Sequence, residues 1–430
     1  MTRDVSDALD MTTRRAERQL VPTNGTAGGS ELPVVASYCA TFLKPEMLHI
    51  YRQITSLRRL QPVVIAQKRE NVAQFPFQEL YLVRKSPTYF LRRIWHRQLR
   101  EAPWHISPRE VRELVRVLEK RRAELLHVYF GHIAVHLLPL IRSWPHPSIV
   151  SFHGADVGVD LQKRGYRDAT IEMLNAVSRV LVRSESLRAA LVELGCAPEK
   201  IELQRTGIPL GDFPFRERDA PANGEWRLLQ ASRLIEKKGL KTTLGAFAKF
   251  RGDFPQATLT IAGEGPQLDE LQQLSRELKL AEAVRFTGFL SQPQLRELFY
   301  SSHLFLHPSQ TGADGNQEGI PNSMLEAMAT GLSVFATYHG GIPEAVQDGV
   351  TGILVAECDR DSLATALVEC ARAPERLQMM GGAAAESVAA NFAQWTQAQR
   401  LEDIYLREIV SSRAERRLDA TAKPRFSSCR

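Results

Sequence analysis

Short runs of apolar, β-branched residues alternate along the chain with longer stretches in which apolar positions recur at helical spacing. Runs that are apolar almost throughout are typical of strands buried on both faces of a parallel sheet, with helices between them. In the first half the predicted strands are 34–38, 63–67, 125–130, 148–154, 180–184 and 201–207. In the second half they are 226–232, 259–265, 284–288, 304–309, 333–337 and 352–356. The pattern predicts an α/β protein with two Rossmann-like, doubly wound domains that face each other across a cleft.

Polar segments divide this alternation into parts. The N-terminal segment carries acidic residues and no apolar core, so it does not have the pattern of a secretory signal. The last 20 residues hold six Lys and Arg against two acids and are expected to be mobile. The expected parts are a flexible leader 1–30, an N-terminal acceptor-side domain 31–212, a linker 213–225, a C-terminal nucleotide-sugar-binding domain 226–395, a helix 396–410 that crosses back to the first domain, and a basic tail 411–430.

Composition narrows the class of protein. The 430 residues are 43% hydrophobic and 24% charged, as in ordinary soluble proteins, and no apolar run approaches the length of a spanning helix. The five cysteines are scattered and show neither a disulfide framework nor metal-ligand spacing. We therefore expect no metal site and a cytoplasmic location. The net charge of +6 suits a phosphate-bearing ligand or an anionic membrane surface.

Two glutamates flank a predicted helix start in "DGNQEGIPNSMLEAMATG", residues 314–331. Pro321 suits the first helical turn, and Gly331 ends the helix. Glu318 then precedes the helix and Glu326 lies within it. The free N–H groups between them form a ready phosphate site, and the Glu326 carboxylate can accept two hydrogen bonds from a diol such as a ribose. The alternative is a solvated helix whose acidic residues favour the helix dipole.

Other strand-end loops carry phosphate-binding chemistry. In "ASRLIEKKG" Arg233 and Lys238 lie five apart, and a guanidinium with an ammonium can hold a diphosphate. In "AGEGP" Gly263 and Gly265 allow close approach of the backbone to a ligand. A further loop, "YHGGIPEAV", is expected to lead into a helix that begins with Pro343. Each loop alone is equally well explained as a solvated turn.

Taken in order, "SRLIEKKG", "AGEGP", "LHPS", "EGIPNSMLE" and "GGIPEAVQDGVTGILV" resemble the retaining glycosyltransferases of family 4, which have the GT-B fold. The fuller run "ADGNQEGIPNSMLEAMATGLSVFATYHGGIPEAV" is most similar to bacterial exopolysaccharide enzymes of the colanic acid and amylovoran type. The resemblance implies a UDP- or GDP-sugar donor, transfer with retention, and no obligatory metal or other cofactor. It implies a sugar contact for Glu318, a ribose contact for Glu326 and a diphosphate grip for Arg233 and Lys238. The remaining residues assigned to the donor are Gly263, Gly265, Gly319, Ile320, Pro321 and Asn322.

The first domain resembles the family less sharply. "VSFHGADVG" is similar to the family's strand-end histidine segment, so His153 is the candidate for a catalytic contact with the transferred sugar. His127 and His132 are alternatives. The Gly-rich loop that many members carry after the first strand is missing here, so Lys44 and Glu46 are suggested on the acceptor side by position alone.

The segment 84–100 carries six Lys and Arg, no acid, and interleaved aromatic residues. Such a helix can lie on an anionic membrane, where a lipid-linked acceptor would be found. Alternatively its apolar side packs on the sheet while the basic side meets water. Nucleic acid is not expected, since no binding motif accompanies the charge.

These observations predict a glycosyltransferase that moves a hexose from a nucleotide-sugar to a saccharide or polyprenyl-diphosphate-linked acceptor in polysaccharide biosynthesis. It would be cytoplasmic, with peripheral contact to the inner membrane face. One alternative is a sucrose- or glycogen-type synthase or a sugar-nucleotide epimerase on the same fold. Another is a non-catalytic partner in a polysaccharide assembly complex.

Overall fold

The computed structural model describes residues 31–86, 89–94, 103–154, 161, 164–313 and 317–422, and contacts divide the chain into two units. The N-terminal unit comprises 32–207, 313–320 and the chain from 394 onward; the C-terminal unit comprises 208–312 and 321–393. The predicted leader and the end of the predicted tail, 423–430, lie outside the described residues. None of the helices in the described part of the chain combines the length and the hydropathy needed to cross a bilayer.

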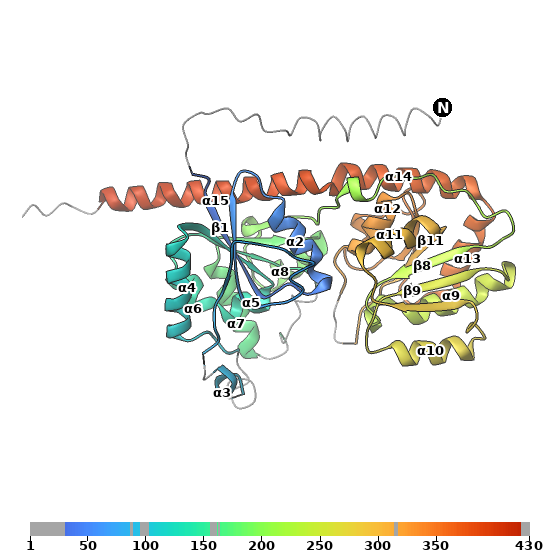
Figure 1. The fold of residues 1–430 in the computed structure, drawn as a ribbon, viewed down its shortest axis with the longest axis horizontal. Coiled ribbons are helices and arrows are strands. Elements are labelled where there is room, and N and C mark those ends of the chain that lie inside the picture. The colour runs from blue at the N-terminus through green and yellow to red at the C-terminus, as the bar shows by residue number, and fades with distance from the viewer. Residues whose placement is uncertain are drawn as a thin grey trace, which may run out of the picture. The chain divides into compact units, whose positions relative to one another are not determined.

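The N-terminal unit is built on a seven-stranded sheet in the order β3-β2-β1-β4-β5-β6-β7, with every described pair parallel. Its strands are β1 (Val34–Phe42), β2 (Gln61–Arg69), β3 (Leu80–Leu82), β4 (Ala123–Tyr129), β5 (Ser148–Ser151), β6 (Arg179–Val182) and β7 (Ile201–Leu203). Its α-helices are α2 (Leu48–Thr55), α3 (Tyr89–Ile94), α4 (Pro108–Lys120), α5 (Gly131–His136), α6 (Leu138–Ser143), α7 (Arg164–Ala176), α8 (Glu185–Glu193) and α15 (Gln394–Ala422). Two 3-10 turns are η1 (Pro45–Met47) and η3 (Pro198–Lys200). Helices cover both faces of this sheet (Figure 1).

The alternation of side chains along β1 explains why both faces are covered. Ala36 and Tyr38 belong to the core that includes Leu114 and Leu118 of α4. Val35 points to the opposite face, where it joins the core cluster that contains residues of α15. A strand apolar at successive positions needs cover on both sides, as the sequence predicted.

The long helix α15 packs on the N-terminal sheet. Leu401, Ile404, Tyr405 and Ile409 recur at helical spacing and are buried against residues of β1, β4, β5 and β6. Near the start of α15, the buried carboxylate of Glu402, 3% exposed, forms an ion pair with Arg59. The Glu402 Oε2 lies 3.0 Å from the Arg59 Nε. The helix runs to Ala422, so the prediction of a mobile tail from 411 onward is wrong for residues 411–422.

The C-terminal unit has a six-stranded parallel sheet in the order β10-β9-β8-β11-β12-β13. Its strands are β8 (Arg227–Ala231), β9 (Thr258–Ala262), β10 (Val284–Gly288), β11 (Leu304–His307), β12 (Ser333–Thr337) and β13 (Ile353–Val355). Its α-helices are α9 (Leu240–Asp253), α10 (Leu268–Glu277), α11 (Gln292–Ser301), α12 (Asn322–Ala329), α13 (Arg360–Ala371) and α14 (Pro374–Phe392). Three 3-10 turns are η4 (Leu210–Asp212), η5 (Glu236–Lys238) and η6 (Ile342–Glu344).

The prediction of two doubly wound parallel sheets is confirmed, and each predicted strand coincides with an observed one. Strand β3 was missed; it has three residues, and none of them is buried. The chain passes from one unit to the other between Gly207 and Ile208 rather than in the predicted linker. That linker begins with Phe213, which is 2% exposed, and Arg218 in its middle donates to the carbonyl oxygen of Phe299 at 3.2 Å. Residues 213–218 are therefore packed against the C-terminal unit.

Candidate functional site

The loop after β8 presents Arg233 and Lys238 in different surroundings. Arg233 is exposed at the carboxyl end of the sheet, where parallel α/β sheets bind their ligands. Lys238 ends the short turn η5 and is only 8% exposed. Gly239 follows with φ of 62°, and a Cβ there would lie 1.7 Å from the carbonyl oxygen of Pro308. Glycine is therefore required where this loop crosses the next strand-end loop.

A buried polar network holds the backbone of this loop. The Gln230 side chain, fully buried on β8, donates from Nε2 to the carbonyl oxygen of Lys238 at 2.8 Å. Its Oε1 accepts from the hydroxyl of Thr243 on α9 at 2.6 Å. Both ends of the amide are thus used, and the turn that carries Lys238 is tied to the strand and to the helix that follows it.

Gly263 and Gly265 pack against the Arg233 loop. Gly263 has φ of 139°, and a Cβ there would lie 1.9 Å from the carbonyl oxygen of Ser232. A Cβ on Gly265 would lie 2.4 Å from the carbonyl oxygen of Leu234. The Leu234 amide also donates to the carbonyl oxygen of Glu264 at 2.8 Å. Glycine is therefore needed at both positions because the two loops contact each other there. The contact of Gly263 and Gly265 with a donor stays a prediction.

The start of α12 lies beside the same strand end. Pro321 is the N-cap residue and the helix begins at Asn322, one residue later than predicted. The hydroxyl of Ser323 donates to the carbonyl oxygen of Ala231 at 2.7 Å, which joins the first turn of α12 to the end of β8. The Arg233 loop and the free N–H groups of this turn therefore belong to one local arrangement. Ser323 was missed, because its importance depends on a partner 92 residues away.

Glu326 is not a solvated helix residue. It is 3% exposed on a helix whose residues from Met324 to Ala329 are all buried. Burying a carboxylate is costly unless it is paired, so this position is under a structural or functional constraint that surface glutamates lack. The interpretation of Glu326 as a surface charge is wrong.

The loop after β12 differs from its prediction. Gly340 adopts φ of 53°, and η6 is a single 3-10 turn that contains Pro343. The helix predicted to begin with Pro343 is therefore only this turn, and β13 follows from Ile353. This loop also holds a pair that the sequence did not reveal, in which Nδ1 of His339 lies 2.7 Å from Oε1 of Glu357.

In the N-terminal unit, His153 lies two residues beyond β5. Its Nε2 is 2.9 Å from the hydroxyl of Ser151, and its ring centroid is 4.6 Å from that of Phe130. Phe130 itself has φ of 77°, which is uncommon for an aromatic residue. Burial lowers the pKa of His153 well below its usual value, and the positive charge of Arg183 adds to the effect. The imidazole is therefore neutral at neutral pH and suited to hydrogen bonding.

The segment that contains Glu318 runs beside His153. A Cβ on Gly154, whose φ is 117°, would lie 3.4 Å from the amide nitrogen of Gly319. A Cβ on Gly319 would lie 3.8 Å from the carbonyl oxygen of His153. Gly319 and Ile320 are buried, whereas Glu318 is partly exposed. Ala313 and residues 317–320 belong by contacts to the N-terminal unit, and not to the C-terminal domain in which they were predicted.

The alternative histidines have different surroundings. His127 is completely buried on β4, and its Nδ1 lies 2.5 Å from the hydroxyl of Tyr405 on α15. Burial lowers its pKa to about 3. A neutral, core-packed histidine joined to a helix is a structural residue, so the alternative assignment of His127 is wrong. His132 is partly exposed on α5, with its ring 5.9 Å from that of Phe130.

A pocket open to solvent lies within the N-terminal unit. Its walls come from α2, from the chain beyond β6 and β7, and from the start of α15. Arg52, Arg183 and Arg205 line it, and none of the described lining residues is acidic. Sequence reasoning missed these arginines, because Arg183 and Arg205 lay within the predicted strands 180–184 and 201–207, whereas the observed strands β6 and β7 end before them. Lys44 is exposed and does not line this pocket, and the side chain of Glu46 lies outside the description.

Solved structures identify the class of fold. The complex of Anabaena Alr3699/HepE with UDP and glucose matches with a TM-score of 0.69 and 18% identity, over 87% of this chain and 99% of that one. Sucrose-phosphate synthase from Thermosynechococcus elongatus matches with a TM-score of 0.70 and 18% identity, over 88% of this chain and 100% of that one. The fold is GT-B, with two Rossmann-like domains.

Sequence comparison places the chain in a family. Residues 48–212 match the model "Glycosyltransferase Family 4" and residues 213–387 match "Glycosyl transferases group 1". The putative colanic acid biosynthesis glycosyltransferase WcaL of Salmonella typhimurium is 33% identical over 56% of this chain and 60% of its own length. Amylovoran biosynthesis glycosyltransferase AmsK of Erwinia amylovora is 32% identical over 57% of this chain and 61% of its own length. The chain belongs to the family 4 glycosyltransferases, and its match spans less than two thirds of these relatives.

Proposed function

We propose that the protein is a glycosyltransferase of exopolysaccharide biosynthesis that transfers a hexose from UDP- or GDP-sugar to a saccharide or lipid-linked acceptor. The observation that carries this proposal is the cluster around the end of β8. There the Ser323–Ala231 hydrogen bond joins the start of α12 to the loop of Arg233 and Lys238. Two cations beside free helix N–H groups suit a diphosphate. Relatives of colanic acid and amylovoran synthesis support the pathway class.

In this proposal the C-terminal unit holds the donor. Arg233, Lys238 and the first turn of α12 bind the diphosphate and stabilise the negative charge that develops on the leaving nucleotide. Glu326 binds the ribose hydroxyls. Because the positive groups are supplied by side chains and amides, the reaction requires no metal ion.

The proposed sugar contacts belong to the N-terminal unit. Glu318 binds hydroxyls of the transferred sugar, and the neutral His153 contacts the same sugar by hydrogen bonding. The proximity of Gly319 to the His153 carbonyl group supports this pairing of roles. The two glutamates are assigned to the sugar and to the ribose, and neither acts as the acid or base of a glycosidase. We expect front-face transfer with retention, as the family resemblance implies, since the sequence offers no convincing nucleophile.

The acceptor is proposed to bind the pocket lined by Arg52, Arg183 and Arg205. Three guanidinium groups at one pocket favour a ligand with negative charge, such as a phosphate or a carboxylate. A diphosphate-linked saccharide or an acidic sugar has that chemistry. A neutral acceptor such as free fructose does not.

The test is a thermal-shift and turnover screen with UDP- and GDP-sugars. A ligand at 100 times its dissociation constant adds about 2.7 kcal/mol to the free energy of unfolding. The sugar-nucleotide that gives the largest shift is then offered with anionic saccharide acceptors, and release of nucleoside diphosphate is measured. The anomeric configuration of the product, read by NMR, tests retention. A donor epimerised without transfer supports the epimerase alternative, and a chain that binds no sugar-nucleotide supports the non-catalytic one.

A further inference from the structure

Exposed apolar side chains gather on α3 and just before it. Phe90 is 67% exposed, Leu91 69% and Ile94 36%, and Leu82 at the end of β3 is 56% exposed. Other large exposed apolar residues of the described chain stand singly along the sequence, as on ordinary protein surfaces. Three exposed apolar side chains on one short helix form a local concentration of apolar surface, whose exposure to water is unfavourable. The interpretation in which the apolar side of this segment packs on the sheet is wrong for these residues.

Basic residues accompany these apolar side chains. Arg84, Lys85 and Arg93 are all exposed, and the sequence from 80 to 94 contains no acid. Exposed cations interleaved with exposed Phe, Leu and Ile have the composition of a surface that lies at a membrane interface. The chemistry matches anionic headgroups for the charges and the acyl boundary for the apolar groups.

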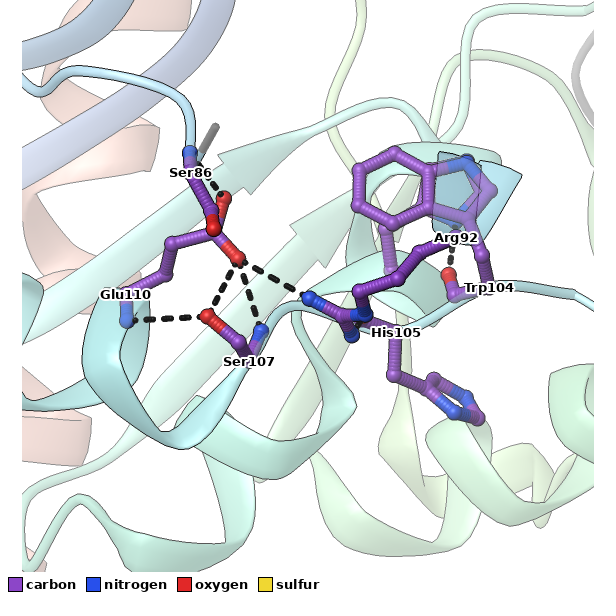
Figure 2. Close-up of polar contacts among 7 residues, drawn as sticks. Ser86, Arg92, Trp104, His105, Ser107 and Glu110 are labelled. Carbon is purple, nitrogen blue, oxygen red and sulfur yellow. Dashed lines mark hydrogen bonds and ion pairs between the residues drawn. The ribbon is translucent and has the colours of Figure 1, made fainter. Parts of the chain in front are cut away.

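One basic residue of α3 is used differently. Nη1 of Arg92 lies 3.3 Å from Oε2 of Glu110, and the other terminal nitrogen donates to the carbonyl oxygen of His105. Figure 2 shows this guanidinium turned toward the start of α4, with the Glu110 carboxylate at the centre of the contacts. Arg92 therefore holds α3 to the fold and leaves Arg93 and its apolar neighbours exposed.

The carboxylate of Glu110 joins four groups. Its Oε2 accepts from the amide of Ser107 at 2.8 Å and from the Ser107 hydroxyl at 2.7 Å, which forms the capping box of α4. Its Oε1 accepts from the amide of Ser86 at 3.2 Å. Burial acts to raise the pKa of Glu110, but the bonds from Ser107 and Ser86 and the charge of Arg92 lower it overall. The ionised carboxylate therefore holds Ser86, which follows β3, and Arg92 of α3 to the start of α4.

We propose that α3, together with Arg84 and Lys85, docks the protein on an anionic lipid surface, with Glu110 and Arg92 as the positioning pair. Phe90, Leu91 and Ile94 enter the headgroup–acyl boundary, while Arg84, Lys85 and Arg93 meet lipid phosphates. A protein partner is the other possible occupant. The lipid surface is favoured because exposed positive charge beside a short apolar stretch complements an anionic bilayer without any matching shape.

The place of α3 in the topology links docking to the proposed function. All strands of the N-terminal sheet are parallel, so the chain beyond β3, β5 and β6 leaves the same edge of the sheet. The docking residues, His153 and Arg183 therefore all follow carboxyl ends of strands at that edge. The idea that docking brings this edge of the sheet to a lipid-linked acceptor rests on the proposed function, whereas docking itself does not.

The test is co-sedimentation of the full chain with phosphatidylcholine vesicles, and with vesicles of phosphatidylcholine and phosphatidylglycerol at roughly three to one. One variant combines Phe90→Ser with Leu91→Ser, and its control is Met379→Ser, which is equally exposed at 69% on α14. A second variant combines Arg84→Ser, Lys85→Ser and Arg93→Ser. Its control removes three exposed arginines elsewhere, Arg276, Arg285 and Arg400.

Binding is expected only with phosphatidylglycerol present, and it should weaken as salt is added. The apolar variant should bind about tenfold more weakly or worse, and the basic variant about fivefold more weakly for each cation removed. Both controls should bind nearly as the unchanged protein does. Affinity for nucleoside diphosphate in solution should stay the same in all four, so a failure of docking is distinguishable from a failure of the proposed function.

The positioning role has its own readout. Glu110→Gln should speed tryptic cleavage after Arg84, Lys85 or Arg93, since the carboxylate no longer holds the segment. Glu113→Gln, on the same helix, should not. Equal sedimentation with both kinds of vesicle, no sedimentation, or no loss in the Phe90 and Leu91 variant would overturn the docking proposal. Unchanged cleavage in Glu110→Gln would overturn the positioning role.

Discussion

The contact between the Gly263 turn and the Arg233 loop can be tested by adding one methyl group. Gly263→Ala places a Cβ 1.9 Å from the carbonyl oxygen of Ser232 at a φ of 139°, which L-residues avoid. Backbone on both sides of the contact has to move. The Arg233 loop follows directly after Ser232, so the clash should displace the loop that is proposed to bind the diphosphate.

The magnitude follows from the strain. A residue held in a sparsely populated backbone region costs about 1–3 kcal/mol, and the clash adds to it. We expect a loss of at least about 2 kcal/mol, or roughly 4–8 °C in the unfolding midpoint of a unit of this size. Displacement of the grip should also reduce donor turnover by about tenfold or more, since misplacement by about 1 Å can cost as much as a hundredfold.

The assay is thermal unfolding of the full chain beside steady-state donor turnover. The control is Gly252→Ala near the end of α9, where a Cβ would meet nothing within 4 Å. That change should leave turnover unaltered and stabilise the helix by up to about 1 kcal/mol. If Gly263→Ala matched this control in both measurements, the loop-contact account would be refuted.

Further predictions concern the glutamates, a buried histidine and metal ions. Glu326→Gln should weaken donor and nucleoside diphosphate binding alike by about 10- to 150-fold, since both contain the ribose, whereas Glu318→Ala should reduce turnover and spare nucleotide affinity in calorimetry. The opposite pattern would contradict the assigned roles. Burial lowers the pKa of His127 from 6.5 to about 3, so stability should fall as pH drops through 6.5 toward 3, by at most about 1.4 kcal/mol per pH unit from this group. His127→Gln should flatten that slope in urea titrations, and an unchanged slope would count against it. Turnover should survive excess EDTA, and loss restored by magnesium would end the metal-independent account.

The sheets were predictable because their signal is local. Buried parallel strands are apolar at nearly every position, so runs such as "VVASY" and "LTIAG" can be recognised as strands from the local sequence alone. Loops after those strands had to carry the chemistry, which led to Arg233, Lys238 and His153. The edge strand β3, none of whose three residues is buried, was not recognised in this way.

Long-range contacts could not be read in the same way. The bond from Ser323 to Ala231 and the bond between His127 and Tyr405 join residues far apart in sequence, and no periodicity connects them. Residues 317–320 lie in sequence between two elements of the C-terminal unit, yet they group by contacts with the N-terminal unit. Likewise, the basic composition of α3 was visible, but the inward turn of Arg92 to Glu110 was not.

The central claim, that the loop after β8 holds the diphosphate of a nucleotide-sugar, is tested most directly by calorimetry on Arg233→Ala. Arg233 is exposed, so its removal should change the free energy of unfolding by less than about 0.5 kcal/mol. Loss of a charge-assisted hydrogen bond should weaken binding of UDP or GDP, whichever gives the larger thermal shift, by about 10- to 150-fold. Binding of the corresponding free nucleoside should barely change. Equal loss for nucleoside and nucleoside diphosphate, or no loss for either, would contradict the account.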